Sequence, residues 1–253
     1  MVGFVICGLE HSGTTLVSEL LRQVPGVDAG FEVGALLAET PRDFPLLQPY
    51  AEHMLWGWGL TQEAFLSCCE TDSFDIFYER LRVSATKLRP NTHVIYDKTP
   101  RYLAALELCM SRVVAPFIVT YKDPRSTVYS DFKSSGRDDF DRWFDEYAAE
   151  KIGYMRLHYA EFLRARDTRD PRVCLVRLED LCLYPHLTCD RIFAHVGYRF
   201  DLGYLSFRGE RYQNTRVGSI AIGLPFEYRT ALDARRHATI AKKFAGFEAW
   251  FFE

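Results

Sequence analysis

The stretch VGFVICGLEHSGTTLVSELLR at residues 2–22 decides how the chain begins to fold. Residues 2–7 are a short apolar run rich in β-branched and aromatic side chains, which predicts a buried parallel strand. Leu16, Leu20 and Leu21 recur at helical spacing and predict an amphipathic helix. A strand, a glycine-bounded loop and a helix in succession aim backbone N–H groups and the positive end of a helix dipole at one point. We therefore expect residues 8–15 to bind a phosphate group; the alternative is an ordinary strand-to-helix turn.

This loop differs from the nucleoside-triphosphate pattern G-x-x-x-x-G-K-[ST] at one decisive position. Thr14 stands where the pattern has lysine. Because that lysine serves the β- and γ-phosphates of a nucleoside triphosphate, the loop is poorly suited to ATP or GTP. It remains suited to a 5′-phosphate that carries another group.

Composition limits the class of protein. The chain has 253 residues, 48% hydrophobic and 26% charged, with a net charge of −3, which predicts one α/β domain over residues 1–253 and no nucleic-acid partner. Its seven cysteines include no C-x-x-C pair, and no histidine cluster has zinc spacing. We therefore expect reduced thiols, a cytoplasmic location and no metal. No apolar segment reaches membrane-spanning length, and the sequence does not indicate an oligomeric state.

Beyond the first loop, strand and helix patterns alternate. Strands are expected at 93–96, 113–121 and 172–178, and helices at 61–69, 73–88, 101–111, 140–166 and 185–196. This order predicts an α/β fold with a parallel sheet flanked by helices. Ligands bind at the carboxyl ends of such strands. Four polar clusters are expected at that edge: the Gly8 loop, Asp97-Lys98, Lys122-Asp123 and Glu179-Asp180.

Four stretches resemble the sulfotransferases that use 3′-phosphoadenosine 5′-phosphosulfate (PAPS). HSGTTL at 11–16 resembles the family's [RK]-S-G-T-T-L loop around the 5′-phosphosulfate, and DKTPRY at 97–102 is similar to K-T-P-x-Y. YKDPRSTVYS at 121–130 resembles R-D-P-R-x-x-x-x-S, the segment that grips the 3′-phosphate, and VRLEDL at 176–181 is similar to R-x-E-D-L. The resemblance covers nearly the whole chain. It implies a P-loop NTPase-like sulfotransferase fold, with PAPS as co-substrate and no metal.

The resemblance implies a set of co-substrate contacts. The 5′ side would be bound by His11, Ser12, Gly13, Thr14 and Thr15, and the 3′-phosphate by Lys122 and Ser130. Arg125 would share the phosphate or pair with an acid such as Glu179, and Arg216 and Gly218 resemble, more weakly, a loop that closes over the 3′ end.

Two positions depart from the family pattern. His11 stands where Arg or Lys is usual, and Lys122 stands where Arg is usual. Lys122 keeps the charge but loses the bidentate fork, whereas the charge of His11 depends on pH near neutrality. We expect these changes to weaken co-substrate binding but not to abolish it.

Three residues are expected to be catalytic. Lys98 would stabilise the transferring group or the bridging oxygen, with pairing to Asp97 as the alternative, and His11 would approach the same oxygens. Glu32 falls at the spacing of the glutamate base in tyrosylprotein-type members; the alternative is a carboxylate favoured by a helix dipole. The position that carries a histidine base in cytosolic small-molecule members is not a histidine here, since His93 precedes the strand.

The acceptor is expected to be a hydroxyl, less readily an amine, on a small molecule, lipid or carbohydrate. Trp56 and Trp58 and an aromatic content of 15% favour an apolar or ring-bearing acceptor under a hydrophobic lid, although the two tryptophans would equally suit a core cap. Two other classes stay open. A nucleotide kinase or NTPase would require Mg²⁺-ATP, and a nucleotide-binding module without turnover is compatible with His11 and Lys122.

Overall fold

The central sheet has four parallel strands in the order β4-β1-β5-β6. The computed structural model describes residues 1–206, 220 and 223–252. Within this part of the chain, the sheet strands are β1 (Val5–Gly8), β4 (Asp97–Lys98), β5 (Phe117–Tyr121) and β6 (Val173–Arg177). Every residue of β1 is buried, as expected for a strand with neighbours on both sides and helices on both faces. Two further short strands, β2 (Val27–Asp28) and β3 (Val94–Ile95), pair with each other in a separate parallel ribbon.

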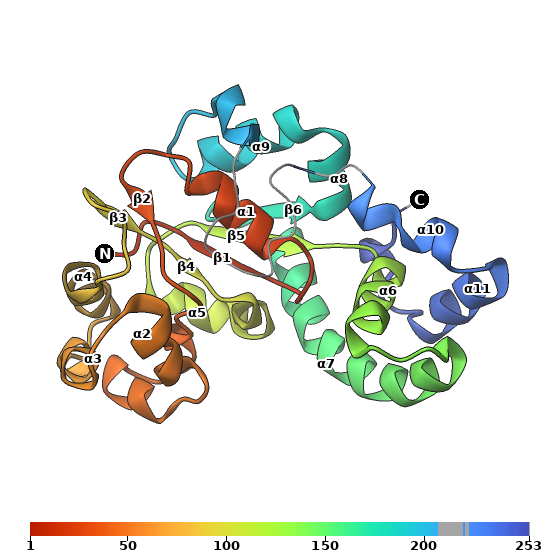
Figure 1. The fold of residues 1–253 in the computed structure, drawn as a ribbon, viewed down its shortest axis with the longest axis horizontal. Coiled ribbons are helices and arrows are strands. Elements are labelled where there is room, and N and C mark those ends of the chain that lie inside the picture. The colour runs from red at the N-terminus through yellow and green to blue at the C-terminus, as the bar shows by residue number, and fades with distance from the viewer. Residues whose placement is uncertain (207–219, 221–222, 253) are drawn as a thin grey trace.

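Helices cover both faces of the sheet, and further helices lie beside it (Figure 1). Figure 1 shows α1 (Thr14–Leu21) and α9 (Pro185–His195) on one side of the sheet, with α5 (Leu106–Arg112) and α7 (Phe140–Thr168) on the other. The remaining α-helices are α2 (Tyr50–Trp58), α3 (Gln62–Cys69), α4 (Phe74–Ser84), α6 (Pro124–Ser135), α8 (Leu178–Leu183), α10 (Tyr228–Ala231) and α11 (Ala234–Lys243). The predicted α/β class with a parallel sheet is confirmed.

Strand register places the polar clusters at one edge. Val5 of β1 is level with Asp97 on one side and Phe117 on the other, and Gly8 is level with Thr120. On the far side of β5, Tyr121 is level with Arg177. Because all four strands are parallel, the segments that follow them all begin at the same edge of the sheet.

Four predicted boundaries were wrong. The helix expected at 73–88 ends at Ser84, because Ala85 has an extended backbone. The strand expected at 93–96 is two strands, because the chain leaves the β2–β3 ribbon at Tyr96 and joins the main sheet at Asp97. The helix expected at 101–111 begins as a 3-10 turn over Pro100–Ala105. The strand expected at 113–121 begins at Phe117, after Pro116, which has no N–H to donate to a ladder.

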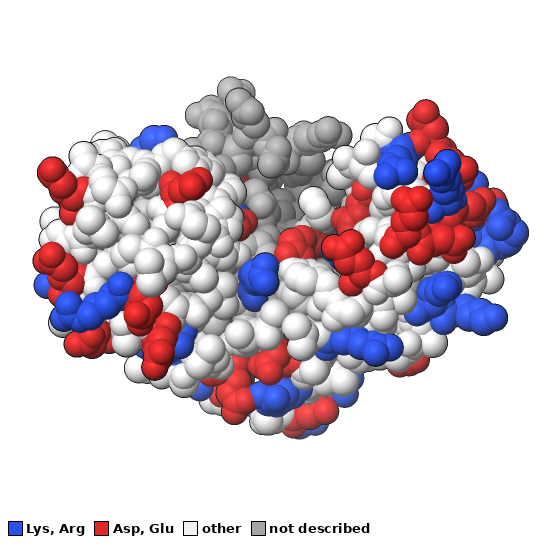
Figure 2. Space-filling view, turned by 90° about the horizontal axis from the view of Figure 1, so that it is seen from below, with Lys and Arg blue, Asp and Glu red and all other residues white. Residues whose placement is uncertain are grey.

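The cysteines and the surface charges are arranged as the composition predicts. All seven cysteines are buried and none forms a disulfide. The face in Figure 2 shows both signs of charge interspersed, most densely on the side of α6, α10 and α11, rather than one basic stripe. No helix in the described residues is both long enough and apolar enough to cross a membrane.

Candidate active site

The loop between β1 and α1 is shaped by one glycine and one buried hydroxyl. Gly13 has a φ of 95°, a left-handed conformation, and a Cβ at this position would lie 2.7 Å from Leu178 Cδ1. The Ser12 hydroxyl is fully buried and bonds the Leu9 carbonyl and Thr120, whose Oγ1 lies 2.7 Å away. Ser12 therefore anchors the loop to β5 through its side chain, while its backbone N–H donates to the Leu9 carbonyl at 3.1 Å and closes the turn. Thr14, the first residue of α1, is also buried.

Lys122 and Ser130 meet beside this loop. Lys122 follows β5, and its Nζ donates to Ser130 Oγ at 2.8 Å and to the Ser126 carbonyl at 3.3 Å. Asp123 caps α6 by accepting from the Arg125 backbone N–H at 2.7 Å, which fixes the start of the helix that carries Ser130. Burial lowers the pKa of Lys122 to about 8, while the nearby carboxylate of Asp131 acts in the opposite direction.

Arg125 does not pair with Glu179. Its guanidinium pairs with Asp123 at 2.5 Å and donates to the Phe252 carbonyl at 2.9 Å. Glu179 instead accepts from the Asp123 backbone N–H at 2.9 Å, and burial raises the pKa of Glu179 to about 7. Arg125 thus ties α6 to the C-terminal segment.

The two predicted catalytic groups Glu32 and Lys98 form an ion pair. Lys98 Nζ lies 2.9 Å from Glu32 Oε1, and their side chains are 6% and 21% exposed. The lysine also lies over the Phe31 ring, 5.0 Å from its centroid. The alternative of a surface lysine paired with Asp97 is wrong, because Lys98 is buried and its carboxylate partner comes from a segment 66 residues away.

Asp97 has a structural role. Its fully buried carboxylate accepts hydrogen bonds from the hydroxyls of Tyr78 and Tyr102, both at 2.6 Å, and of Thr99 at 2.7 Å. Burial raises the pKa of Asp97, although these three donors act in the opposite direction. The network holds the edge strand β4 and therefore the backbone of Lys98.

His11 lies half-exposed at the tip of the first loop, with a φ of 61°. Its Nε2 is 3.6 Å from Asp131 Oδ1. Burial lowers the pKa of His11, and the charges of Lys122 and Lys151 act in the same direction, whereas Asp131 raises it. At this position the protein therefore provides a ring whose charge depends on pH, where the family pattern has a permanent cation.

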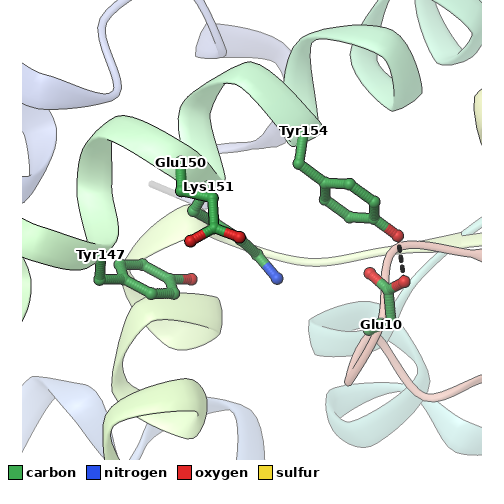
Figure 3. Close-up of a pocket in the computed structure, with 5 residues that line it drawn as sticks. All are labelled: Glu10, Tyr147, Glu150, Lys151 and Tyr154. Atoms are coloured by element: carbon green, nitrogen blue, oxygen red, sulfur yellow. Dashed lines mark hydrogen bonds between the residues drawn. The ribbon is translucent and has the colours of Figure 1, made fainter.

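The structure places five further residues around a pocket beside His11 (Figure 3). They are Glu10, Tyr147, Glu150, Lys151 and Tyr154. The sequence analysis predicted a helix at 140–166 but did not single out this group. A pattern was present nevertheless: a lysine at 151 lies four residues after one tyrosine and three before another, which puts all three on one face of α7.

The tryptophans divide between the two interpretations. Trp58 is fully buried, its ring packs on Gly30 and its Nε1 donates to the Phe31 carbonyl at 2.7 Å, so it belongs to the core. Trp56 is 52% exposed and packs against Phe31, with ring centroids 4.7 Å apart. Arg216 and Gly218 lie outside the described residues.

Comparison with known proteins agrees with this geometry. Residues 4–201 match the model of a sulfotransferase family. The fold is similar to the sulfotransferase domain of the olefin synthase from Synechococcus PCC 7002, with a TM-score of 0.66 and 21% identity over 96% of this chain and 94% of that one. A sulfotransferase domain from the curacin biosynthetic pathway gives 0.57 and 16% over 97% and 98%. Mouse sulfotransferase SULT7A1, solved with PAP, gives 0.54 and 10% over 96% and 83%.

The chain therefore belongs to the sulfotransferase family. A search of curated protein sequences found no match.

Proposed function

We propose that residues 1–253 form one domain that transfers a sulfuryl group from PAPS to a hydroxyl acceptor. The observation that carries this proposal is the Lys122–Ser130 contact at 2.8 Å, next to a glycine-bounded loop that opens a helix. This pair supplies an ammonium and a hydroxyl for a second phosphate, while the loop supplies N–H donors for the first. The PAP complex of mouse SULT7A1, a protein of the same fold, supports a 3′,5′-bisphosphate as the shared ligand.

Sulfuryl transfer then requires little covalent chemistry from the protein. The acceptor oxygen attacks sulfur, the bond to the bridging oxygen breaks, and the 5′-phosphate leaves, which yields a sulfate ester and adenosine 3′,5′-bisphosphate. Positioning and charge stabilisation dominate such a step. Lys98 would stabilise charge on the transferring group, and Glu32 would take the acceptor proton, each oriented by their shared ion pair.

The residues near the loop also suit metal-free transfer. Lys122 and Lys151 both lie close enough to His11 for their charges to act on it, and they are candidates to neutralise the phosphates of the co-substrate. Among the described residues, no three His, Cys, Asp or Glu side chains gather as metal ligands.

A thermal-shift comparison tests the proposal. Adenosine 3′,5′-bisphosphate, 5′-AMP, and ATP with and without Mg²⁺ are compared, since a ligand of the native state raises the melting temperature with the logarithm of its concentration over Kd. Stabilisation by the bisphosphate alone, without metal, is expected. Stabilisation only by Mg²⁺-ATP would replace the proposal by a kinase. Bisphosphate binding without transfer to any acceptor of a broad panel would favour a binding module.

A further inference from the structure

A pocket of about 340 Å³ lies between the first loop and the middle of α7. Figure 3 shows its wall: Tyr147, Glu150, Lys151 and Tyr154 project from α7, and Glu10 faces them from the loop. Because the first four residues belong to a single long helix, the shape of the pocket is set by rigid secondary structure. The proposed reaction does not use the two glutamates or the two tyrosines of this pocket.

The pocket adjoins the loop that is expected to bind the 5′-phosphosulfate. Glu10 is the neighbour of His11 in sequence, and Asp131 connects the two walls, with its carboxylate 3.6 Å from His11 Nε2 and 3.0 Å from Lys151 Nζ. Asp131 also accepts from the Tyr147 hydroxyl at 2.6 Å. A molecule held in the pocket would therefore lie beside the loop that is expected to hold the group to be transferred.

The Glu10 carboxylate on the pocket wall has one oxygen without a hydrogen-bond partner in the described residues. The Tyr154 hydroxyl donates to Oε1 of Glu10, which fixes the carboxylate. The second oxygen, Oε2, is shielded from solvent and has no hydrogen-bond partner within the described residues. In Figure 3 the carboxylate faces the Lys151 side of the pocket. A buried carboxylate oxygen is stabilised when a ligand donates a hydrogen bond to it.

The walls favour positive charge. The Lys151 ammonium lies 5.9 Å from the ring centroid of Tyr147 and 5.3 Å from that of Tyr154, which is the range of cation–π attraction. Two carboxylates, those of Glu10 and Glu150, line the space together with this lysine, whose own charge is already paired with Asp131 at 3.0 Å. An acceptor with an ammonium group would reduce the excess negative charge, and an anionic acceptor would increase it.

We propose that this pocket binds the acceptor, and that Glu10 selects ring-bearing hydroxyl acceptors that also carry an ammonium group. The inference rests on the proposed sulfotransferase function. It narrows the acceptor to one chemical class, amino-substituted phenols or alcohols, and makes Glu10 a specificity-determining residue.

Three phenols that differ only in the charge of the side chain test this inference: tyramine, para-ethylphenol and para-hydroxyphenylpropionate. Binding to the protein saturated with adenosine 3′,5′-bisphosphate is measured by isothermal titration calorimetry. We expect tyramine to bind about tenfold more tightly than the propionate, with the neutral phenol between them. The pocket carboxylates attract the ammonium and repel the carboxylate, and a solvent-screened charge pair changes affinity by about threefold in each direction. In Glu10→Gln the ratio is expected to fall towards one.

Matched variants separate this effect from a change of fold. Glu63→Gln, an exposed carboxylate on α3, should leave the ratio unchanged. Glu150→Gln, also exposed but on the pocket wall, should lower the affinity ratio in part. If Glu10→Gln fails to bind the bisphosphate, the ratio in Glu150→Gln becomes the test of the inference. Equal binding of the charged phenols, absence of tyramine binding at millimolar concentration, or an unchanged ratio in both pocket variants would overturn the inference. Bisphosphate stabilisation is measured separately, so its loss would count against the proposed function instead.

Discussion

Lys98 Nζ and Glu32 Oε1 lie 2.9 Å apart, although 66 residues of chain separate them. Lys98 belongs to an edge strand of the central sheet, and Glu32 belongs to the segment that follows β2. The pairing places an acid and a cation together at the edge where co-substrate and acceptor are expected to meet. It is the arrangement on which the proposed proton transfer depends.

Glu32→Gln should abolish turnover and preserve bisphosphate binding. The amide cannot accept the acceptor proton, and positioned general bases contribute about a hundredfold or more to rate. The measurement is sulfate-ester formation over a pH series, with bisphosphate thermal shift as the binding assay. Glu39→Gln, an exposed carboxylate nearby in sequence, is the control. Full activity of Glu32→Gln at every pH would exclude this base.

Lys98→Ala should also lose turnover at nearly unchanged bisphosphate affinity. The lysine is expected to act on the transferring group, which the bisphosphate lacks. Single-turnover rates with PAPS measure the chemical step directly. Lys98→Arg keeps the charge and is expected to recover part of the rate. A large loss of bisphosphate affinity in Lys98→Ala would assign the residue to nucleotide binding.

Ser130→Ala should weaken binding of adenosine 3′,5′-bisphosphate by about fivefold, the effect of one hydrogen bond of about 1 kcal/mol. Lys122→Ala should weaken it by about tenfold or more, because a charge-assisted contact is lost. Calorimetric titrations with the bisphosphate and with 5′-AMP make the comparison. Neither variant should change 5′-AMP affinity much. Equal losses for both nucleotides would remove the 3′-phosphate assignment.

Bisphosphate affinity should fall as pH rises above about 8. The pKa of Lys122 is lowered to about 8 by burial, so the free protein loses the ammonium charge in this range. In an unfolded chain lysine keeps its proton to about 10.5, so the same group makes the ligand-free protein more stable as pH rises between the two values. Lys122→Arg, which stays charged, should give a flat affinity profile. A wild-type profile equally flat would contradict the assignment.

Asp97→Ala should destabilise the protein by about 3 kcal/mol, because three buried hydroxyls lose their common acceptor. Tyr102→Phe removes one of these bonds and should cost about 1 kcal/mol. Urea unfolding gives both values. If Asp97→Ala cost no more than Tyr102→Phe, the network would not be what holds the edge strand.

Local patterns predicted much of the site. The first helix and the Lys122–Ser130 spacing depend on contacts within about ten residues, where backbone geometry fixes which side chains meet. The parallel order of the strands also followed from the alternation of strands and helices. The alternative in which Lys98 pairs with Asp97 was wrong. It had rested only on Asp97 being the nearest acid in the sequence.

The class of fold, the position of the loop and most of the candidate co-substrate residues could be predicted from the amino-acid sequence, because they follow from short-range periodicity and motif spacing. Only the tertiary structure decided that Asp97 serves three hydroxyls, that Arg125 pairs with Asp123, and that Glu10 faces the tyrosines of α7. These contacts join segments brought together by sheet register and helix packing. Which of several acids reaches a given cation is then settled by distance and burial, which no local pattern contains.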